Sequence, residues 1–298
     1  MEIGLVGLGK MGANIARNLT DAGHRVVGFD ASEAARKTMS AEGIEVRASM
    51  AEMVFELSAP RVVWMMVPAG AIAESVLREA YGLLEAGDIV IDGGNSNYKD
   101  SIAQAAEAAE HGIRLLDSGT SGGQSGARNG ACIMVGGDRS AYEHVEPLLQ
   151  DMSCEGGLMY TGPAGSGHFM KMVHNGIEYG MMQAIAEGFA IMEASEFDYD
   201  LVDVAHNWNH GSVVRSWLME LMEQQLTAHP GLEDIRGVVD ASGEAKWTLE
   251  TALELEVPAP VIALSLMTRN ASKIDDSFAN KAVAAMRNGF GGHSYVSK

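Results

Sequence analysis

The sequence predicts an α/β fold, in which a doubly wound parallel sheet is followed by an all-helical C-terminal domain. Short β-rich runs alternate with amphipathic helical stretches up to about residue 160, and the strand signals stop after Gly162-Pro163. The length of 298 residues also suits two domains. We therefore expect one domain over residues 1–162 and a second, helical domain over residues 163–298.

Six β-rich runs make up the sheet predicted for the first domain. They are Ile3–Val6, Arg25–Phe29, Val62–Val67, Asp88–Ile91, Ile113–Asp117 and Ile133–Val135. Amphipathic stretches such as 10–22 and 32–42 lie between them. An order of strand, helix, strand requires crossover connections, and these place parallel strands between two layers of helices.

The second domain is expected to begin with a long helix. Its pattern runs from Gly165 to about Glu196 without a proline, and shorter helical patterns follow at 202–207, 212–223 and 258–286. The glycine and proline at 162 and 163 then mark the hinge between the two predicted domains.

The chain is acidic, with 21 Lys and Arg against 40 Asp and Glu and a formal net charge of −19. Such a charge repels the phosphate backbone of nucleic acids and anionic lipid head groups. We therefore expect neither a nucleic acid nor a membrane surface as partner. An anionic substrate would need a local cluster of Arg, Lys or His.

Cysteine and histidine spacing limits the chemistry further. Cys132 and Cys154 belong to no Cys-x-x-Cys pair, so neither a disulfide framework nor a structural zinc site is expected. His206 and His210 have the spacing of a helical metal pair but lack the acidic third ligand of the matching pattern, and we predict no metal. Because no secretory signal and no apolar run of roughly 20 residues is present, we expect a cytoplasmic protein.

The turn after the first predicted strand has the Gly-x-Gly-x-x-Gly spacing of a dinucleotide-binding fingerprint. Its residues are Gly7, Leu8, Gly9, Lys10, Met11 and Gly12. The first glycine permits the tight turn, the second lets the backbone approach the pyrophosphate, and the third lets the helix pack on the strand. Glycines also gather in turns that bind nothing, but here the motif follows a strand and opens a helix. We therefore predict a Rossmann-like nucleotide site.

The end of the second predicted strand indicates which dinucleotide binds. A carboxylate at Asp30 would accept hydrogen bonds from the ribose 2′-hydroxyl of NAD and repel the 2′-phosphate of NADP. Ala31 and Ser32 follow, where an NADP enzyme typically has an arginine. Arg36 lies only one helical turn further on, so NADP stays possible although NAD is preferred.

Polar residues gather on one face of the long predicted helix. Lys171, His174, Asn175 and Glu178 stand at i, i+3, i+4 and i+7, with Tyr179 at the margin of that face. A solvated face is the plain alternative, but His, Asn and Tyr are unusual choices for one. The helix also has four glycines that each cost about 1 kcal/mol relative to alanine, which suggests close approach of another backbone or a ligand.

This face predicts acid and base chemistry. A partly buried lysine can have its pKa lowered towards neutrality, so that it takes a proton from a hydroxyl group. A glutamic acid that low dielectric keeps protonated can return a proton later. With Lys171 as base and Glu178 as acid, the helix suits oxidation of an alcohol followed by protonation of a carbanion-like intermediate.

Three loops of the first domain are expected to complete the pocket, because ligands of open α/β sheets bind beyond the carboxyl ends of the strands. They are residues 67–70, 92–96 and 118–123. The residues that we expect to line the cofactor site here are Val67, Pro68, Ala69 and Asn95. Ser121, Gly122 and Gly123 offer a hydroxyl and adjacent N–H groups that suit a carboxylate. Taken singly, each loop could equally be a plain turn.

Over nearly its whole length the sequence resembles the 6-phosphogluconate dehydrogenases, in particular their short, mostly NAD-preferring bacterial form. Residues 167–180 carry the most specific likeness, and residues 92–98, 119–130, 245–248 and 287–293 support it. The wider β-hydroxyacid dehydrogenase superfamily shares the fingerprint, the Ser-Gly-Gly loop, the lysine and the asparagine. It does not typically share the His, Glu and Tyr of the helix or the terminal Arg and His.

The resemblance implies oxidative decarboxylation of 6-phosphogluconate to ribulose 5-phosphate and CO2, with reduction of NAD, in the pentose phosphate pathway. It implies that Lys171 deprotonates the 3-hydroxyl group and then polarises the 3-keto carbonyl, and that Glu178 protonates C1 of the enediol. Residues implied to hold the carboxylate and hydroxyls are Asn95, Ser121, Gly122, Gly123, His174 and Asn175. Those implied to hold the phosphate are Tyr179, Arg269, Arg287 and His293, the last two from a partner subunit.

The sequence also departs from this family. Longer members have a phosphate-binding lysine at the place of Ser242, and they double the helical domain, so two copies of this chain would pair as a homodimer or a dimer of dimers. Two other functions stay open. A β-hydroxyacid dehydrogenase for an unphosphorylated substrate such as 3-hydroxyisobutyrate is disfavoured by Arg269, Arg287 and His293, and a non-catalytic NAD-binding regulatory protein is disfavoured by the intact base and acid.

Overall fold

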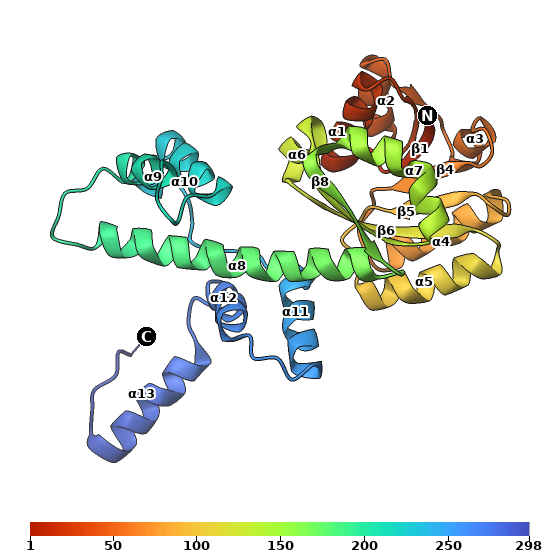
Figure 1. Ribbon diagram of the computed structural model, residues 1–298. Coiled ribbons are helices and arrows are strands. Elements are labelled where there is room, and N and C mark those ends of the chain that lie inside the picture. The colour runs from red at the N-terminus through yellow and green to blue at the C-terminus, as the bar shows by residue number, and fades with distance from the viewer. Residues whose placement is uncertain (298) are drawn as a thin grey trace. The chain divides into compact units, whose positions relative to one another are not determined.

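The structure is a computed structural model that describes residues 1–297 (Figure 1). Its contacts divide the chain into two compact units, residues 1–174 and residues from 175 onward. The boundary expected after residue 162 stays a prediction, whereas this division falls inside helix α8 (Ser166–Glu193). The reason is that the first turns of α8 pack on the sheet, since a Cβ at Gly167 would lie 2.5 Å from the backbone oxygen of Asp117.

Within residues 1–297 eight strands form a single sheet in the order β3-β2-β1-β4-β5-β6-β7-β8. The strands are β1 (Glu2–Val6), β2 (Arg25–Phe29), β3 (Glu45–Val46), β4 (Val62–Met65), β5 (Ile89–Asp92), β6 (Arg114–Ser121), β7 (Ala131–Gly137) and β8 (Ser153–Gly162). The predicted α/β fold class is confirmed. β3 and β8 were not among the predicted strands, because one has two residues and the other contains polar residues and a glycine pair.

One pair of strands differs from the prediction of a parallel sheet. β6 and β7 are antiparallel, with Ser121 opposite Cys132, while the other paired strands among residues 1–297 are parallel. A parallel return needs a crossover of about a dozen residues or more. The connection here is little more than the seven-residue helix α6 (Gly123–Asn129), so the chain turns back directly.

Helices cover both faces of the sheet and form two cores (Figure 1). One core includes α1 (Lys10–Asp21), α2 (Glu33–Ala41), α6 and α7 (Arg139–Met152). The other includes α3 (Met50–Phe55), α4 (Ala71–Leu83) and α5 (Tyr98–Glu110). Side chains of β4 alternate between them, with Trp64 in the first core and Val63 and Met65 in the second. Burial on both sides explains why this strand is an unbroken apolar run.

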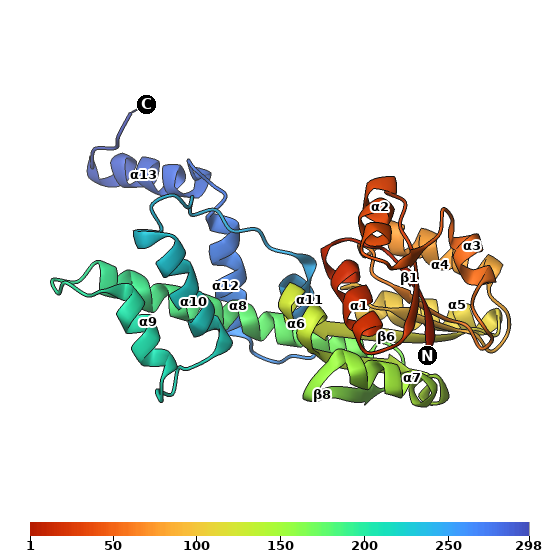
Figure 2. The ribbon, with the colours of Figure 1, turned by 90° about the horizontal axis from the view of Figure 1, so that it is seen from above.

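The second unit is helical, as predicted. It comprises the later part of α8, then α9 (Leu201–Asn209), α10 (Trp217–Ala228), a short 3-10 helix (Pro230–Leu232), α11 (Gly243–Glu254), α12 (Pro260–Ala271) and α13 (Phe278–Gly291). Helices α9 and α10 pack side by side over a small core with Phe189 of α8 (Figure 2). None of the helices of residues 1–297 has both the length and the apolar character needed to cross a membrane.

Two of the predicted helices in this unit need correction. The pattern over 258–286 is interrupted, and α12 and α13 are separate because the Ser277 side chain accepts a hydrogen bond from the N–H of Asn280 and starts a new helix. The pattern over 212–223 starts later for the same reason, since the Ser216 side chain caps α10 at the N–H of Met219. Helix α11 was not predicted as a separate helix.

Candidate active site

A cavity of about 430 Å³ lies in the first unit, beyond the carboxyl ends of β1, β4 and β5. Among its lining residues are eight that the sequence analysis assigns to the cofactor: Gly9, Lys10, Met11, Gly12, Val67, Pro68, Ala69 and Asn95. It is also lined by Gly93, Gly94 and Thr120, which belong to two of the loops expected to complete the pocket, and by Met66, which lies outside those loops. Both its position and its size are usual for the ligand site of an open α/β sheet.

The three fingerprint glycines have separate geometric reasons to be glycine. Gly7 has a φ of +95°, and a Cβ there would lie 2.4 Å from the Met66 carbonyl oxygen. A Cβ at Gly12 would lie 1.9 Å from the Gly7 carbonyl oxygen, because the helix packs closely on the turn. A Cβ at Gly9 would meet no atom of residues 1–297 within 4 Å. Gly9 therefore leaves room beside the cavity, as the approach of a pyrophosphate requires.

Asp30, the residue predicted to bind the ribose, connects the fingerprint turn to the start of α2. Its carboxylate accepts hydrogen bonds from the N–H of Leu8 and the N–H of Ser32, both at 2.7 Å. The Arg36 guanidinium donates to the carbonyl oxygens of Asp30 and Ala31, at 2.5 and 3.3 Å. Each carboxylate oxygen has a second lone pair that can still accept a hydrogen bond from a ribose hydroxyl.

Lys171 lies on α8 against residues 118–123 at the end of β6, which we call the substrate loop because the sequence predicts that it binds the substrate. Its side chain is only 7% exposed, and its stem occupies the space beside Gly119, where a Cβ would lie 2.4 Å from the Lys171 Cβ. Lys171 Nζ is 3.5 Å from Nδ1 of His174, and Nε2 of His174 is 3.1 Å from Oγ of Ser121. The structure thus brings together three predicted residues, Lys171, His174 and Ser121, in one unit with the nucleotide cavity.

The N-terminus of α8 is held by a residue that the sequence analysis does not assign to the site. Asp117 of β6 is fully buried, and its carboxylate accepts hydrogen bonds from the N–H of Gly165 at 2.6 Å and of His168 at 2.8 Å. An anion at this position satisfies orphan N–H groups and complements the helix dipole. Because Asp117, Gly119 and Ser121 alternate along β6, one face of this strand fixes successive turns of α8.

In the loop after β6, Gly122 and Gly123 both have positive φ angles, +114° and +57°. Gly122 is the N-cap of α6. A Cβ at this position would lie 2.9 Å from the Cα atom of Gly126. Asn95 is exposed at the rim of the nucleotide cavity. The backbone N–H groups of Gly122 and Gly123 stay candidates for binding a carboxylate.

In the second unit, Tyr179 and Arg269, both predicted to hold a phosphate, lie together. The Arg269 guanidinium stands 3.4 Å from the centre of the Tyr179 ring. The Tyr179 hydroxyl lies 3.1 Å from Oγ of Ser242 and accepts from the N–H of Ser242 at 3.0 Å. Ser242 therefore stands beside these two residues, where the sequence analysis noted only the absence of a lysine.

The remaining residues of the predicted helix face also belong to this unit. Asn175 is buried, and its side-chain amide donates to Oε1 of Glu244 at 3.2 Å, while Oε2 of the buried Glu244 has no hydrogen-bond partner among residues 1–297. Glu178 is half-buried and lies seven residues beyond Lys171 on the continuous helix α8. Seven residues are nearly two full turns, so both side chains leave the helix on the same side.

Arg287 and His293, the other residues predicted to hold the phosphate, lie at the C-terminal end of the described chain. Both are exposed, Arg287 near the end of α13 and His293 just after it, and the described part of the chain gives neither an ion pair. The backbone oxygen of His293 accepts from the Asn288 side chain at 3.0 Å. Their assignment to the phosphate therefore stays a prediction that depends on a second subunit.

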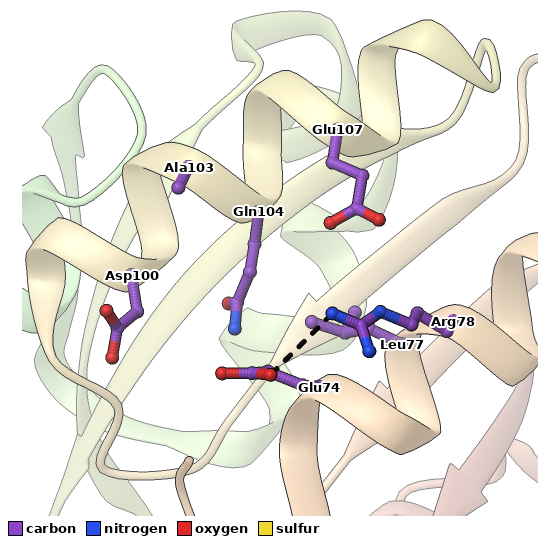
Figure 3. A pocket seen from close by; sticks show the side chains of 7 residues that line it. All are labelled: Glu74, Leu77, Arg78, Asp100, Ala103, Gln104 and Glu107. Atoms are coloured by element: carbon purple, nitrogen blue, oxygen red, sulfur yellow. Dashed lines mark ion pairs between the residues drawn. The ribbon is translucent and has the colours of Figure 1, made fainter. Parts of the chain in front are cut away.

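A second cavity, of about 200 Å³, lies between α4 and α5 and contains no predicted site residue. Figure 3 shows three carboxylates around it, Glu74, Asp100 and Glu107, with a single arginine, Arg78, whose guanidinium is 3.8 Å from Glu74. Such a lining repels an anionic substrate. Within residues 1–297 no three His, Cys, Asp or Glu side chains are arranged to hold a metal ion.

Comparison with known proteins gives family models and relatives that all have the name 6-phosphogluconate dehydrogenase. Residues 2–162 match the family model described as the NAD binding domain of 6-phosphogluconate dehydrogenase, and residues 167–288 match its C-terminal domain. A Bacillus subtilis protein, YqeC, provisionally named a 6-phosphogluconate dehydrogenase, is 53% identical over the full length of both chains. The NAD(+)-dependent, decarboxylating 6-phosphogluconate dehydrogenase of Haloferax volcanii is 40% identical over all of this chain and 99% of its own.

Among solved structures, 6-phosphogluconate dehydrogenase of Plasmodium falciparum is similar, with a TM-score of 0.85 and 30% sequence identity. The similarity covers all of this chain and 66% of that chain. The present chain therefore spans about two thirds of the length of that enzyme.

Proposed function

The chain belongs to the 6-phosphogluconate dehydrogenase family, and from that premise we propose that it converts 6-phosphogluconate to ribulose 5-phosphate and CO2 with NAD as oxidant. The observation that carries the proposal is the buried Lys171, held against Gly119 and near His174 in the unit that contains the nucleotide cavity. The place of the reaction in the pentose phosphate pathway and the location in the cytoplasm stay predictions.

The mechanism begins with Lys171 as base. Its Nζ takes the proton of the 3-hydroxyl group of the substrate, which lets electrons leave the carbon that carries this group. A bound nicotinamide would supply the acceptor for the hydride. The Lys171 ammonium then donates a hydrogen bond to the 3-keto oxygen and stabilises the negative charge that develops there when CO2 departs. Gly119 keeps the lysine stem in place, and burial excludes water from it.

Glu178 is proposed to complete the reaction as acid. It stands seven residues after Lys171 on the same side of α8, and both side chains are long enough to reach one bound sugar acid. Its proton goes to C1 of the enediol that decarboxylation leaves. Ser121, Gly122, Gly123, Asn95, His174 and Asn175 would orient the carboxylate and hydroxyls. A solved complex with the substrate elsewhere would contradict these roles.

NAD is the proposed cofactor, and Asp30 supports it. The carboxylate is fixed by the N–H groups of Leu8 and Ser32, so it cannot turn away from a 2′-phosphate. Arg36, on the first turn of α2, donates to the carbonyl oxygens of Asp30 and Ala31. The NAD(+)-dependent relative of Haloferax volcanii agrees with this choice.

Tyr179 and Arg269 are the proposed phosphate-binding residues of the chain itself. Arg269 supplies the positive charge and Tyr179 and Ser242 supply hydroxyl groups beside it. Such a local cation is what an anionic substrate needs in a chain of net charge −19. Arg269 also argues against 3-hydroxyisobutyrate, which has no phosphate to pair with it.

The test is a substrate and cofactor screen that follows reduced nicotinamide and released CO2 together. We expect equal amounts of both from 6-phosphogluconate with NAD. Oxidation without CO2 would indicate a β-hydroxyacid dehydrogenase that acts on an unphosphorylated substrate. Binding of NAD without turnover of any substrate would indicate the regulatory protein.

A homodimer or a dimer of dimers is proposed as the active form. Helix α13 has no buried residue, and its apolar Phe278, Met286 and Phe290 are 82%, 61% and 79% exposed. Exposed apolar side chains of this number on one helix mark an interaction surface. A second copy that covers α13 would hold Arg287 near a neighbouring site.

Mixed subunits test whether Arg287 acts across this interface. Lys171→Met and Arg287→Ala chains are unfolded together and refolded as mixed dimers. If Arg287 completes the partner's site, each mixed dimer contains one site with both wild-type residues and regains activity. If Arg287 serves its own chain, both sites stay defective and no activity returns.

A further inference from the structure

Two cysteines outside the proposed chemistry stand opposite each other in the first unit. Both thiols are free and exposed, Cys132 on β7 and Cys154 on β8. β7 and β8 are parallel, and Ala131 is the ladder partner of Ser153. The next residue of each strand is a cysteine, and at these two residues the regular pairing of β7 with β8 is interrupted. Neighbouring strands lie about 4.8 Å apart, which is within the roughly 4.4–6.8 Å between Cα atoms that a disulfide spans.

The backbone at this point is free to adjust. The ladder is irregular after Ala131 and resumes at Ile133 with Leu158, so Cys132 alone faces the segment 154–157. This segment ends in Gly156, with a φ of +71°, and Gly157. A Cβ at Gly157 would lie 2.7 Å from Sγ of Cys154 and also 2.7 Å from the backbone oxygen of Ala131, which places that sulfur close to β7.

The electrostatics of Cys132 indicate the same proximity. Burial raises the pKa of its thiol, the charge of Cys154 raises it further, and the Lys171 ammonium lowers it. The pKa of Cys132 therefore depends on both the Cys154 thiol and Lys171, the proposed catalytic base. Because a thiol that resists ionisation is a poor first nucleophile, we assign the first reaction with an oxidant to Cys154 and the second step to Cys132.

We propose that Cys132 and Cys154 are a peroxide-sensitive pair that closes to an intrachain disulfide beside the substrate loop. The Cys154 thiolate attacks hydrogen peroxide, an S–O bond forms, the O–O bond breaks, and hydroxide leaves. The Cys132 thiol then attacks the resulting sulfenic acid, the S–S bond forms, and water leaves. In sum, two thiols and one hydrogen peroxide give one disulfide and two waters. A dithiol reductant reverses the reaction.

The disulfide acts on substrate binding through β6. Cys132 is the antiparallel ladder partner of Ser121, whose hydroxyl lies 3.1 Å from Nε2 of His174. A disulfide at Cys132 restrains β7 beside this pair and the adjoining Gly122, all of which we assign to the substrate. No residue of β7 or β8 lines the nucleotide cavity, so NAD binding is left unchanged. This consequence rests on the proposed function, whereas formation of the disulfide does not.

The full-length wild-type protein is treated with hydrogen peroxide and then analysed by intact mass and peptide mapping. We expect the loss of two hydrogens and a single peptide linking Cys132 to Cys154 within one chain. Cys154→Ser and Cys132→Ser are the matched controls, with Cys132→Ala in reserve should the serine variant fail to fold. They should keep the basal activity and form no such peptide. A disulfide between two chains, or oxidation to sulfinic acid with no disulfide, overturns the proposal.

Kinetics then separate this inference from the proposed function. The oxidised protein should show a several-fold higher KM for 6-phosphogluconate, unchanged NAD binding, and full recovery with dithiothreitol. Oxidised single variants should show none of these changes. A disulfide that leaves the KM unaltered refutes the coupling to the substrate loop. Inactivity of the reduced wild-type protein instead refutes the proposed function and leaves the mass result to decide the disulfide.

Discussion

At the scale of single residues, Lys171 depends on neighbours that sequence spacing alone does not reveal. Its stem is accommodated only because residue 119 is glycine, and its amine is 3.5 Å from His174. Replacement of this one side chain therefore tests the proposed chemistry directly.

Lys171→Met should reduce kcat by about a hundredfold to ten thousandfold, which is the usual contribution of a general base. Methionine has nearly the same length and fills the space beside Gly119, so the dissociation constant of NADH should stay the same. The measurement pairs steady-state kinetics with a fluorescence titration of NADH. Lys37→Met is the control, because this lysine is exposed and pairs only with Glu33. Near-normal turnover by Lys171→Met would remove the base assignment.

Asp30→Ala should change the choice of cofactor. The variant loses an acceptor for the ribose hydroxyl and a charge that repels a 2′-phosphate, and a hydrogen bond to a charged group contributes roughly 1.5–3 kcal/mol. The ratio of kcat/KM for NAD to that for NADP should then fall at least about tenfold. Glu33→Ala is the control, since it removes an exposed acidic residue of the same loop and helix. An unchanged ratio would argue against the ribose assignment.

At the scale of elements, the position of helix α8 depends on a buried side chain of strand β6, the carboxyl group of Asp117. Asp117 stands in for a capping side chain, and it binds the N–H groups of Gly165 and His168, residues 48 and 51 positions away. The same strand contacts Lys171 through Gly119. A change at Asp117 should therefore affect both the stability of the first unit and the position of the base.

Asp117→Ala should lower the melting temperature and kcat together. It leaves two N–H groups without an acceptor, each worth about 1–3 kcal/mol when buried. Asp117→Asn keeps one acceptor oxygen and should recover part of both losses. Asp138→Ala is the matched control, because Asp138 caps α7 in the same unit by accepting from the N–H of Ala141 at 2.7 Å. A similar fall in kcat for Asp138→Ala would show that lost stability alone explains the effect.

Elements differ in how far the sequence predicts them. The buried strand β4 is evident as a continuous apolar run and helix α8 as a long helical pattern without a proline, because both signals are local. The spacing from Lys171 to Glu178 is equally local, so both were identified as candidates from the sequence. The role of Asp117, and the contact of Tyr179 with Ser242 across 63 residues, depend on folding and have no local signal. The reversal of β7 has no signal in the order of strands and helices, because it depends on the short connection through α6.

At the scale of the whole molecule, the acidic excess is offset locally by arginines. Arg25 pairs with Glu2, Glu45 and Glu56, and Arg47 pairs with Glu45 and Glu56. The hydrogen bond from Arg47 holds the pKa of Glu56 below its usual value, and that from Arg25 does the same for Glu45. These two arginines therefore connect β2 to the segments that follow it.

Lowered carboxylate pKa values make stability depend on pH in a definite direction. Above a pH of about 4.5, the ordinary value of these groups, they are ionised in both the folded and the unfolded chain, and the ion pairs contribute fully. As the pH falls below that value, the unfolded chain takes up protons first, and the contribution is lost as the pH passes the lower pKa values of the folded chain.

Arg47→Gln should make the protein less stable at neutral pH but less sensitive to acid. With the pKa of Glu56 back near its ordinary value, proton uptake by the folded and unfolded chains becomes more alike. The melting temperature measured from neutral pH down past 4.5 should therefore fall less steeply than in the wild type. Arg78→Gln is the control, because it makes the same change in net charge at an exposed pair 3.8 Å apart on α4. If both variants follow the same pH curve, net charge alone governs acid stability and the Arg47 pairs have no separate role.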